Sequence, residues 1–263
     1  MLHQRTSRLS EEELYEIVAR VEALLPGAWD RATGRKRALP LVYAVEATVI
    51  YLRRNHVQEV IGEFYDVSQA TISRIISILT PLVREATARE IPTREQVEER
   101  IAGKIVLLDG TLAPVWSWAG HRELWAGKHK TTGMNFQVVT DAWGRVITIS
   151  EPIEGCAHDM RALEESGLRE LLALADAVFA DKGYKGSGYF TPRKKPAGGE
   201  LTDEQKQYNA QIGAIRAPVE RAIANIKVWR ILHTDYRRPL QTFQDTFHAV
   251  IGLYWFKLNR RFA

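Results

Sequence analysis

The spacing of apolar residues changes near Lys104, and this change constrains the fold more than any other feature. Before it, apolar residues recur every three or four positions, as in amphipathic helices. After it come two short apolar runs, 105–108 and 177–180, each of a length typical of a buried strand. Strands separated by helical stretches favour an α/β or α+β arrangement. We therefore expect an all-α domain over about 1–92 and an α/β domain over about 104–263.

Local signals place further elements in both domains. In the first, helices are expected at 10–24, 40–54, 57–65 and 68–79, with Pro81 beginning another helix that ends near Pro92. In the second, we expect a hairpin of 134–139 with 145–150, helices at 159–174, 202–232 and 240–258, and a loop at 191–199. Asp159 is the expected N-cap of the first of these helices.

The helical domain contains the pattern of a helix-turn-helix motif. Asp66 stands at the turn, where a residue that tolerates positive φ is needed, and Ser68 is placed to cap the second helix. The apolar positions of that helix face inward, which leaves Gln69, Ser73 and Arg74 on its outer side. Gln and Arg can read base edges in a major groove, and Ser can contact phosphate. A helical pair without DNA contact is the alternative.

Three acidic residues stand where a metal site could be built. Asp109 and Asp181 each directly follow one of the two apolar runs, and a strand end places a carboxylate at the rim of a sheet. Glu220 lies in a helical stretch, on one face with Arg216 and Lys227. Carboxylates suit Mg²⁺, and two such ions about 3.5–4 Å apart can activate an attacking oxygen and stabilise a leaving one. Each acidic residue alone also fits a turn, a cap or an ordinary ion pair.

Charge and composition indicate the surroundings of the protein. Residues 181–263 carry 15 Lys and Arg against 7 Asp and Glu, a balance of +8, whereas the whole chain carries +4. This favours a polyanionic partner, with solvated helix faces as the alternative. The single cysteine, Cys156, cannot form an internal disulfide, no signal core begins the sequence, and no apolar run approaches the ~20 residues of a membrane span. We expect a cytoplasmic protein without a membrane partner.

Several short motifs follow one another in a specific order. They are Val67-Ser68-Gln69-Ala70-Thr71-Ile72-Ser73-Arg74, Leu108-Asp109-Gly110-Thr111, Gly127-Lys128-His129-Lys130, His158-Asp159, Asp181-Lys182-Gly183-Tyr184-Lys185-Gly186 and Arg216-Ala217-Pro218-Val219-Glu220-Arg221-Ala222. With them the chain resembles bacterial insertion-sequence transposases of the IS5 group, whose helix-turn-helix and DDE endonuclease domains are also related to the Harbinger transposases. The resemblance covers nearly everything after residue 40.

The resemblance implies an RNase H-like catalytic domain, a mixed sheet flanked by helices. It carries the two catalytic aspartates onto Asp109 and Asp181 and the glutamate onto Glu220, with Mg²⁺ or Mn²⁺ as the pair of ions. Asp159 matches a His-Asp pair of the family and is interpreted as a helix cap or a residue behind the ligands, with metal ligation as the alternative. Related transposases often have Tyr three residues before the Arg of the last motif, where this chain has Gly213.

Four basic residues outside the helix-turn-helix are implied to contact DNA: Lys128, Lys130, Arg216 and Lys227. The implied reaction is hydrolysis at the element ends, followed by attack of the freed 3′-hydroxyl on target DNA. The implied partners are double-stranded DNA, as terminal inverted repeats and target, and further copies of the chain in a homodimer or larger complex at the bacterial nucleoid. Two alternatives stay open: a non-enzymatic DNA-binding regulator, and a nuclease of the same fold that no longer moves an element.

Overall fold

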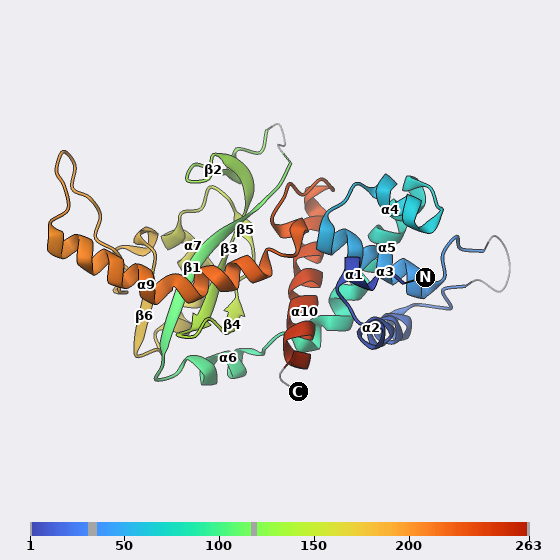
Figure 1. Ribbon diagram of the computed structural model, residues 1–263, viewed down its shortest axis with the longest axis horizontal. Helices are drawn as coiled ribbons and strands as arrows, with labels where there is room; N and C mark the ends of the chain where they lie inside the picture. Colours follow the sequence, from blue (N-terminus) through green and yellow to red (C-terminus); the bar gives the residue numbers. More distant parts are fainter. Residues whose placement is uncertain (1, 31–35, 117–119, 262–263) are drawn as a thin grey trace. The chain divides into compact units, whose positions relative to one another are not determined.

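The computed structural model describes residues 2–30, 36–116 and 120–261, and Figure 1 shows its helices and strands. The chain forms two compact units. The first unit combines the described residues of Met1–Ile91 with those of Val228–Ala263, and the second is Pro92–Lys227. None of the helices in the described ranges is long and apolar enough to cross a membrane.

The first unit is helical. Its helices are α1 (Gln4–Ser7), α2 (Glu11–Leu24), α3 (Leu41–Arg54), α4 (Gln58–Tyr65), α5 (Gln69–Thr87) and α10 (Phe243–Arg261), with the 3₁₀ turns η1 (Ala88–Glu90), η4 (Arg230–Leu232) and η5 (Leu240–Thr242). Helix α5 is central, because it packs against α2, α3, α4 and α10. The ranges expected for the helices before α5 agree with the structure to within about a residue at each end.

Helix α5 passes through Pro81 without interruption, so the expected start of a new helix at this proline is wrong. A proline inside a helix costs about 3 kcal/mol, because it removes one backbone hydrogen bond and crowds the preceding turn. Leu79 and Val83 lie on either side of Pro81 and are fully buried, as are Ile76 and Ile72, about one and two turns before Leu79. Each such side chain contributes about 1.5–3 kcal/mol on burial, so packing outweighs the cost of the proline.

Helix α10 belongs to the helical unit, which corrects the expectation that all of 104–263 forms one domain. Its side chains Phe247, Val250 and Leu253 are buried, and the helix packs against α5 and η1. Lys257 on the same helix donates to a carboxylate oxygen of Glu13 over 2.7 Å. The apolar face of α10 is thus covered within the helical unit, because that unit offers the matching apolar surface.

The second unit is a mixed sheet flanked by helices, as expected. Its strands are β1 (Ile105–Pro114), β2 (Trp125–Ala126), β3 (Thr131–Asp141), β4 (Val146–Ile149), β5 (Ile153–Glu154) and β6 (Ala177–Ala180). Its helices are α6 (Arg94–Ile101), α7 (Asp159–Glu165), α8 (Leu168–Leu172) and α9 (Asp203–Ile226), with the 3₁₀ turns η2 (Arg122–Leu124) and η3 (Lys182–Tyr184). Strand β1 pairs with β3 in antiparallel and with β6 in parallel orientation, and β2, β4 and β5 also pair with β3.

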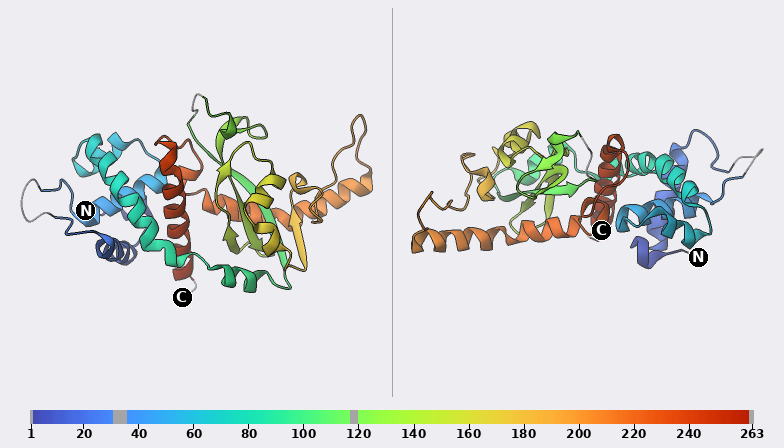
Figure 2. Two further views of the ribbon diagram at one scale, coloured as in Figure 1. Left: turned by 180° about the vertical axis from the view of Figure 1, so that it is seen from behind. Right: turned by 90° about the horizontal axis from the view of Figure 1, so that it is seen from above.

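Helices cover both faces of this sheet, as the right-hand view of Figure 2 shows. Val106 and Leu108 of β1 belong to a core that includes buried residues of α6, α7 and α8. Successive side chains of a strand point to opposite faces, so Asp109 points to the other face, where α9 packs against β1, β3 and β6. The sheet therefore separates a closed apolar core from a layer that contains an acidic residue.

Two expected helices are shorter than the sequence indicated. The stretch 159–174 divides into α7 and α8 at Gly167, which has a φ of 69° and interrupts the regular helix. Helix α9 ends at Ile226, and the residues after it form a separate turn, η4. Apolar periodicity continued across both breaks, so it did not indicate them.

Candidate active site

Asp109 and Asp181 come together through the register of two parallel strands. Leu108 of β1 pairs with Ala180 of β6, and each aspartate is the next residue along its strand direction. Strand β6 ends there, but β1 continues to Pro114 through its pairing with β3. The expectation that Asp109 ends its strand is therefore wrong. It lies inside β1, at the point where the neighbouring strand stops and the sheet edge opens.

Arg216 of α9 lies among the candidate carboxylates. Its Nη2 is 2.9 Å from Oδ2 of Asp109, and its Nη1 is 3.8 Å from Oδ1 of Asp181. The buried residues of α9 recur at helical intervals, and Arg216 belongs to this stripe between Ile212 and Val219. The same periodicity that docks α9 on the sheet thus carries the guanidinium to the end of β6.

Glu220 is one helical turn beyond Arg216 and reaches the same guanidinium. Its Oε1 lies 3.8 Å from Nη1 of Arg216, and its side chain is 60% exposed, compared with 16% for Asp109 and 20% for Asp181. The three acidic residues that the sequence singled out therefore converge on one cation, two of them largely covered and one open to solvent.

Lys128 connects this group to a fourth carboxylate. It lies in the turn between β2 and β3, and its Nζ is 3.3 Å from Oδ2 of Asp181 and 3.5 Å from Oδ2 of Asp159. Asp159 is the first residue of α7, whereas the N-cap is His158, so the expected capping role of Asp159 is wrong. The structure instead places the Asp159 carboxylate beside the candidate site, so the interpretation of Asp159 as a residue behind the ligands stays a prediction.

Two glycines make room for the Asp159 carboxylate. A Cβ atom at Gly183 would come within 1.8 Å of Asp159 Oδ2, and one at Gly110 within 3.1 Å of Asp159 Oδ1. Below them, the amide of Gln137 donates to the backbone oxygen of Asp159 and to the hydroxyl of Tyr184, over 3.1 and 2.9 Å. A side chain at Gly183 would therefore displace Asp159, whereas one at Gly110 would only press tightly against the Asp159 carboxylate and the Tyr184 hydroxyl.

The two strand-following aspartates differ in acidity. Burial raises the pKa of Asp109 to about 6, against the effect of Arg216, and the nearby charge of Asp181 acts in the same direction as burial. Burial would also raise the pKa of Asp181, but the backbone N–H of Lys182 and the cations Lys128 and Arg216 outweigh it, so this pKa is lowered. Near neutral pH, Asp181 is thus the more firmly ionised of the pair.

The remaining basic candidates occupy different surroundings. Lys227 directly follows α9, and its Nζ donates to the backbone oxygen of Leu112 over 2.9 Å. Burial lowers the pKa of Lys227, so this lysine is not a freely solvated one. Lys130 is exposed and has a φ of 51° at the end of the turn that holds Lys128.

The pair of helices α4 and α5 has the local features expected of its sequence. Asp66 has a φ of 51° at the turn, and the Ser68 side chain accepts a hydrogen bond from the backbone N–H of Thr71. A Cβ at Gly62 would come within 2.4 Å of the Val67 carbonyl oxygen, so the helix and the turn approach too closely for any side chain there. Gln69 and Arg74 are exposed, and Ser73 is half-buried.

The donor atoms of the candidate site fit a hard divalent cation. The available ligands are carboxylate oxygens, which Mg²⁺ prefers, and the site already stabilises positive charge in the form of Arg216 and Lys128. Among the described residues, no three His, Cys, Asp or Glu side chains are close enough together to hold one metal ion. In this arrangement the carboxylates lie within 4 Å of the Arg216 guanidinium or the Lys128 ammonium group.

Comparison with known proteins identifies the class to which this site belongs. A family model described as DDE superfamily endonuclease matches residues 108–254, which is more than half of the chain. The chain belongs to this family, and it is therefore an endonuclease of a superfamily that uses divalent metal ions. The match begins one residue before Asp109 and includes Asp181 and Glu220.

Individual relatives are transposases of bacterial insertion sequences. The chain is 31% identical over 223 residues to a protein of Streptomyces albus G named putative transposase for insertion sequence element IS112. The aligned region covers 84% of this chain and 80% of the relative. It is 26% identical over 234 residues to the probable transposase for insertion sequence element IS702 of Microchaete diplosiphon. That aligned region covers 86% of this chain and 83% of the relative.

Proposed function

We propose that this protein is a transposase of the IS5 group that cuts DNA at the ends of an insertion-sequence element and joins the freed 3′-hydroxyl to target DNA. The observation that carries the proposal is the convergence of Asp109, Asp181 and Glu220 on Arg216 at the end of β6. Family membership and the similarity to two insertion-sequence transposases support it.

Asp109, Asp181 and Glu220 would hold a pair of Mg²⁺ or Mn²⁺ ions in an RNase H-like domain. Bound there, these ions would activate the attacking oxygen and stabilise the leaving oxygen of an in-line phosphoryl displacement. The chain's own residues position the carboxylates: Arg216 fixes Asp109, and Lys128 steadies Asp181. Before any metal binds, these two cations also reduce the repulsion between the acidic cluster and the DNA backbone.

Binding of the element ends is assigned to helices α4 and α5 as a helix-turn-helix. Exposed Gln69 and Arg74, with Ser73 between them, would lie in the major groove. Lys130 is exposed at the turn beside the catalytic site, and it would contact a backbone phosphate there together with Lys128. A transposon has two ends, so we propose that two or more copies of the chain act together.

Arg216 and Lys227 have different roles in this proposal. Arg216 is buried and directs its nitrogens at carboxylates, so it acts as a positioning residue for Asp109 rather than as a direct phosphate contact. Lys227 is half-buried and bonded to the backbone of β1, so it supports the sheet beside the site while its charge attracts DNA.

A cleavage and joining assay tests the proposal. The full chain is incubated with a labelled duplex that carries the terminal inverted repeat, a target plasmid, and Mg²⁺, Mn²⁺ or EDTA. The wild-type protein should cut at the repeat boundary and form joined products only with metal. The cleavage rate should fall at least about a hundredfold in Asp109→Asn, Asp181→Asn and Glu220→Gln, while each variant still binds the duplex. Replacing even a residue that only supports a metal ligand typically lowers metal affinity or activity about 10–100-fold.

A matched control comes from the other end of β6. Asp176 directly precedes this strand and is exposed, whereas Asp181 directly follows it, so Asp176→Asn should cleave like the wild type. Binding of the repeat without cleavage by the wild type would favour a DNA-binding regulator. Cleavage without joined products would favour a nuclease that no longer moves an element.

A further inference from the structure

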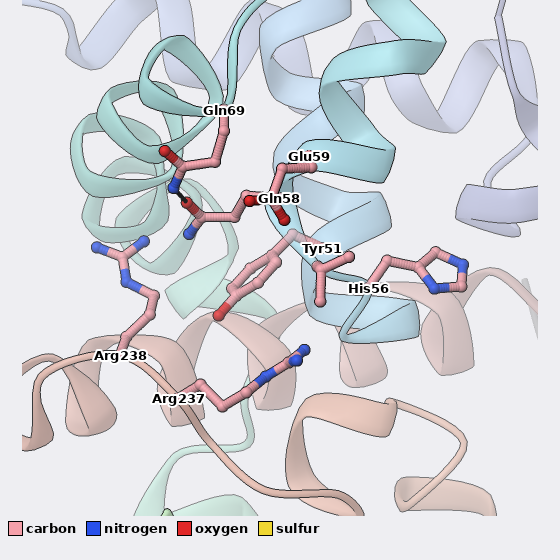
Figure 3. A pocket seen from close by; sticks show the side chains of 8 residues that line it. Tyr51, His56, Gln58, Glu59, Gln69, Arg237 and Arg238 are labelled. Carbon is pink, nitrogen blue, oxygen red and sulfur yellow. Dashed lines mark hydrogen bonds between the residues drawn. The ribbon is translucent and has the colours of Figure 1, made fainter.

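A hollow in the helical unit lies beside the first turns of α4 and α5. Its volume is about 240 Å³, and it is lined by residues from both helices, from α3 and from the segment that precedes η5. Figure 3 shows the Gln58 and Gln69 side chains on one side of it, Arg237 and Arg238 on the other, and Tyr51 between them. Nothing in the catalytic site uses these residues.

The segment 234–238 is fixed against the helical pair through Asn55. The Asn55 side chain donates to the hydroxyl of Thr234 over 2.8 Å and to the backbone oxygen of Asp235 over 3.0 Å. In return, Nη2 of Arg237 donates to the backbone oxygen of Asn55 over 2.7 Å. Asn55 is buried and has a φ of 49° at the end of α3, three residues before the start of α4. Arg237 and Arg238 are therefore held next to the start of α4 by specific contacts.

Only some of the N–H donors of Arg238 form hydrogen bonds within the protein. Its Nη2 donates to the hydroxyl of Ser77 on α5 over 2.9 Å. Its Nη1 is covered by protein, yet it has no hydrogen-bond partner among the described residues. A guanidinium has five N–H donors in a planar fork that suits phosphate oxygens. Arg238 also lines the hollow, and Ser77 uses only one of these N–H groups, so the guanidinium can donate to an anion bound there while it keeps the Ser77 contact.

The opposite side of the hollow is polar and ordered. The amide of Gln69 donates to the side-chain oxygen of Gln58 over 2.7 Å, which ties the first residue of α5 to the first residue of α4. The charged and titratable groups that line the hollow are Arg237 and Arg238 against Glu59, with His56 and Tyr51. Two guanidinium groups and one carboxylate thus line the hollow, so an anion is favoured.

We infer that this hollow receives a phosphate group of the DNA backbone, with Arg238 as its main contact and Arg237 beside it. The inference rests on the proposed role of α4 and α5 in binding DNA. In helix-turn-helix complexes the first helix crosses the backbone while the second enters the major groove, and phosphate contacts fix the register of the protein on the duplex. The hollow lies at the junction of the two helix starts, which is where a phosphate beside the recognised bases would pass.

The salt dependence of DNA binding tests this inference. We would measure the affinity of the full chain for the terminal-repeat duplex and for an unrelated duplex, in EDTA and over a range of salt concentrations. Loss of one phosphate contact reduces the slope of log affinity against log salt by about one unit. Arg238→Ala should show this reduction on both duplexes, with the same fold-loss of affinity on each. Arg238→Lys should keep the slope, because it keeps the charge.

Two control variants separate a phosphate contact from a structural role. Arg84 lies near the other end of α5, where it pairs with Asp245 over 2.6 Å, so Arg84→Ala should leave the slope unchanged. Ser77→Ala removes the hydroxyl that Arg238 contacts but leaves both arginines in place, and it should also leave the slope unchanged. Thermal unfolding of each variant checks that it is folded.

Several results would overturn the inference. One is an unchanged slope for folded Arg238→Ala, and another is an equal loss for Ser77→Ala, which would make the contact a structural one. A loss confined to the terminal-repeat duplex would assign Arg238 to a base instead of a phosphate. If the wild-type protein does not prefer the repeat, the proposed recognition by α4 and α5 fails, whereas the slope of Arg238→Ala on either duplex still tests the phosphate contact.

Discussion

Nη2 of Arg216 lies 2.9 Å from Oδ2 of Asp109, and both side chains are largely covered by the sheet and α9. A buried carboxylate without a partner is costly, and the guanidinium offsets that cost without neutralising the neighbouring acids. Asp181 and Glu220 lie within 4 Å of the same group. The arrangement therefore stabilises several acidic residues in one place, which is a requirement of a site that is to hold divalent cations.

Removal of this guanidinium should destabilise the second unit. Arg216→Ala leaves Asp109 buried without its cation, and breaking a buried pair costs about 3–5 kcal/mol near neutral pH. At pH 5 the loss should be smaller, because Asp109, whose pKa burial raises to about 6, can then take up a proton and lose its charge. Urea unfolding at both pH values measures the difference. Arg221→Ala, an exposed change on the same helix, should cost less than about 0.5 kcal/mol, and equal effects of the two changes would contradict the account.

Gly183→Ala should impair both cleavage and folding. The added methyl group would meet Oδ2 of Asp159 at 1.8 Å, so the carboxylate must move and take Lys128 with it. We expect a loss of stability of about 1–3 kcal/mol from overpacking and at least a tenfold loss of cleavage rate. Gly213→Ala is the control, because a Cβ there meets nothing within 4 Å and the glycine lies inside α9. Alanine at that position should be neutral or stabilising, and wild-type cleavage by Gly183→Ala would remove Asp159 from the site.

Binding of divalent metal should strengthen as the pH rises from 5 to 7. Metal ligands must be deprotonated, and Asp109, with a pKa of about 6, loses its proton in this range. Asp181 has a lowered pKa and is already ionised, so the change should come from Asp109. Titration of Mn²⁺ into the protein at each pH measures the affinity. In Asp109→Asn the affinity should be weaker and nearly independent of pH, and a pH dependence equal to that of the wild type would assign the titrating group elsewhere.

Arg74→Ala should weaken binding to the terminal repeat. Arg74 is exposed on the outer side of α5, one turn beyond Gln69, where the proposed groove contact is made. If Arg74 reads a base, discrimination at that base pair should fall by about 1–3 kcal/mol. Binding to repeats with single base changes measures this. A uniform loss across all duplexes would assign Arg74 to phosphate, and an unchanged affinity of the folded variant would exclude α5 from the groove.

Local pattern and the resemblance to a known family were enough to predict the mixed sheet and the acidic residues near its edge. The two apolar runs end next to Asp109 and Asp181, and strand pairing aligns those ends. Non-local contacts limited the rest. That β1 continues past Asp109 depends on its pairing with β3, and the assignment of α10 to the helical unit depends on which surface covers its apolar face. The contact between Asn55 and Thr234 joins residues 179 positions apart, a distance that no local pattern reports.

Asp181→Cys with a change of metal tests most directly whether this carboxylate binds the catalytic ion. Mg²⁺ prefers oxygen ligands, whereas softer ions accept sulfur. Cleavage of the terminal-repeat duplex by the wild type and by Asp181→Cys is compared in Mg²⁺ and in Mn²⁺, with Asp176→Cys as the control for an added thiol. We predict that Asp181→Cys is at least about a hundredfold slower than the wild type in Mg²⁺ and recovers a large part of its activity in Mn²⁺. Cleavage by Asp181→Cys at the wild-type rate in Mg²⁺ would contradict the account.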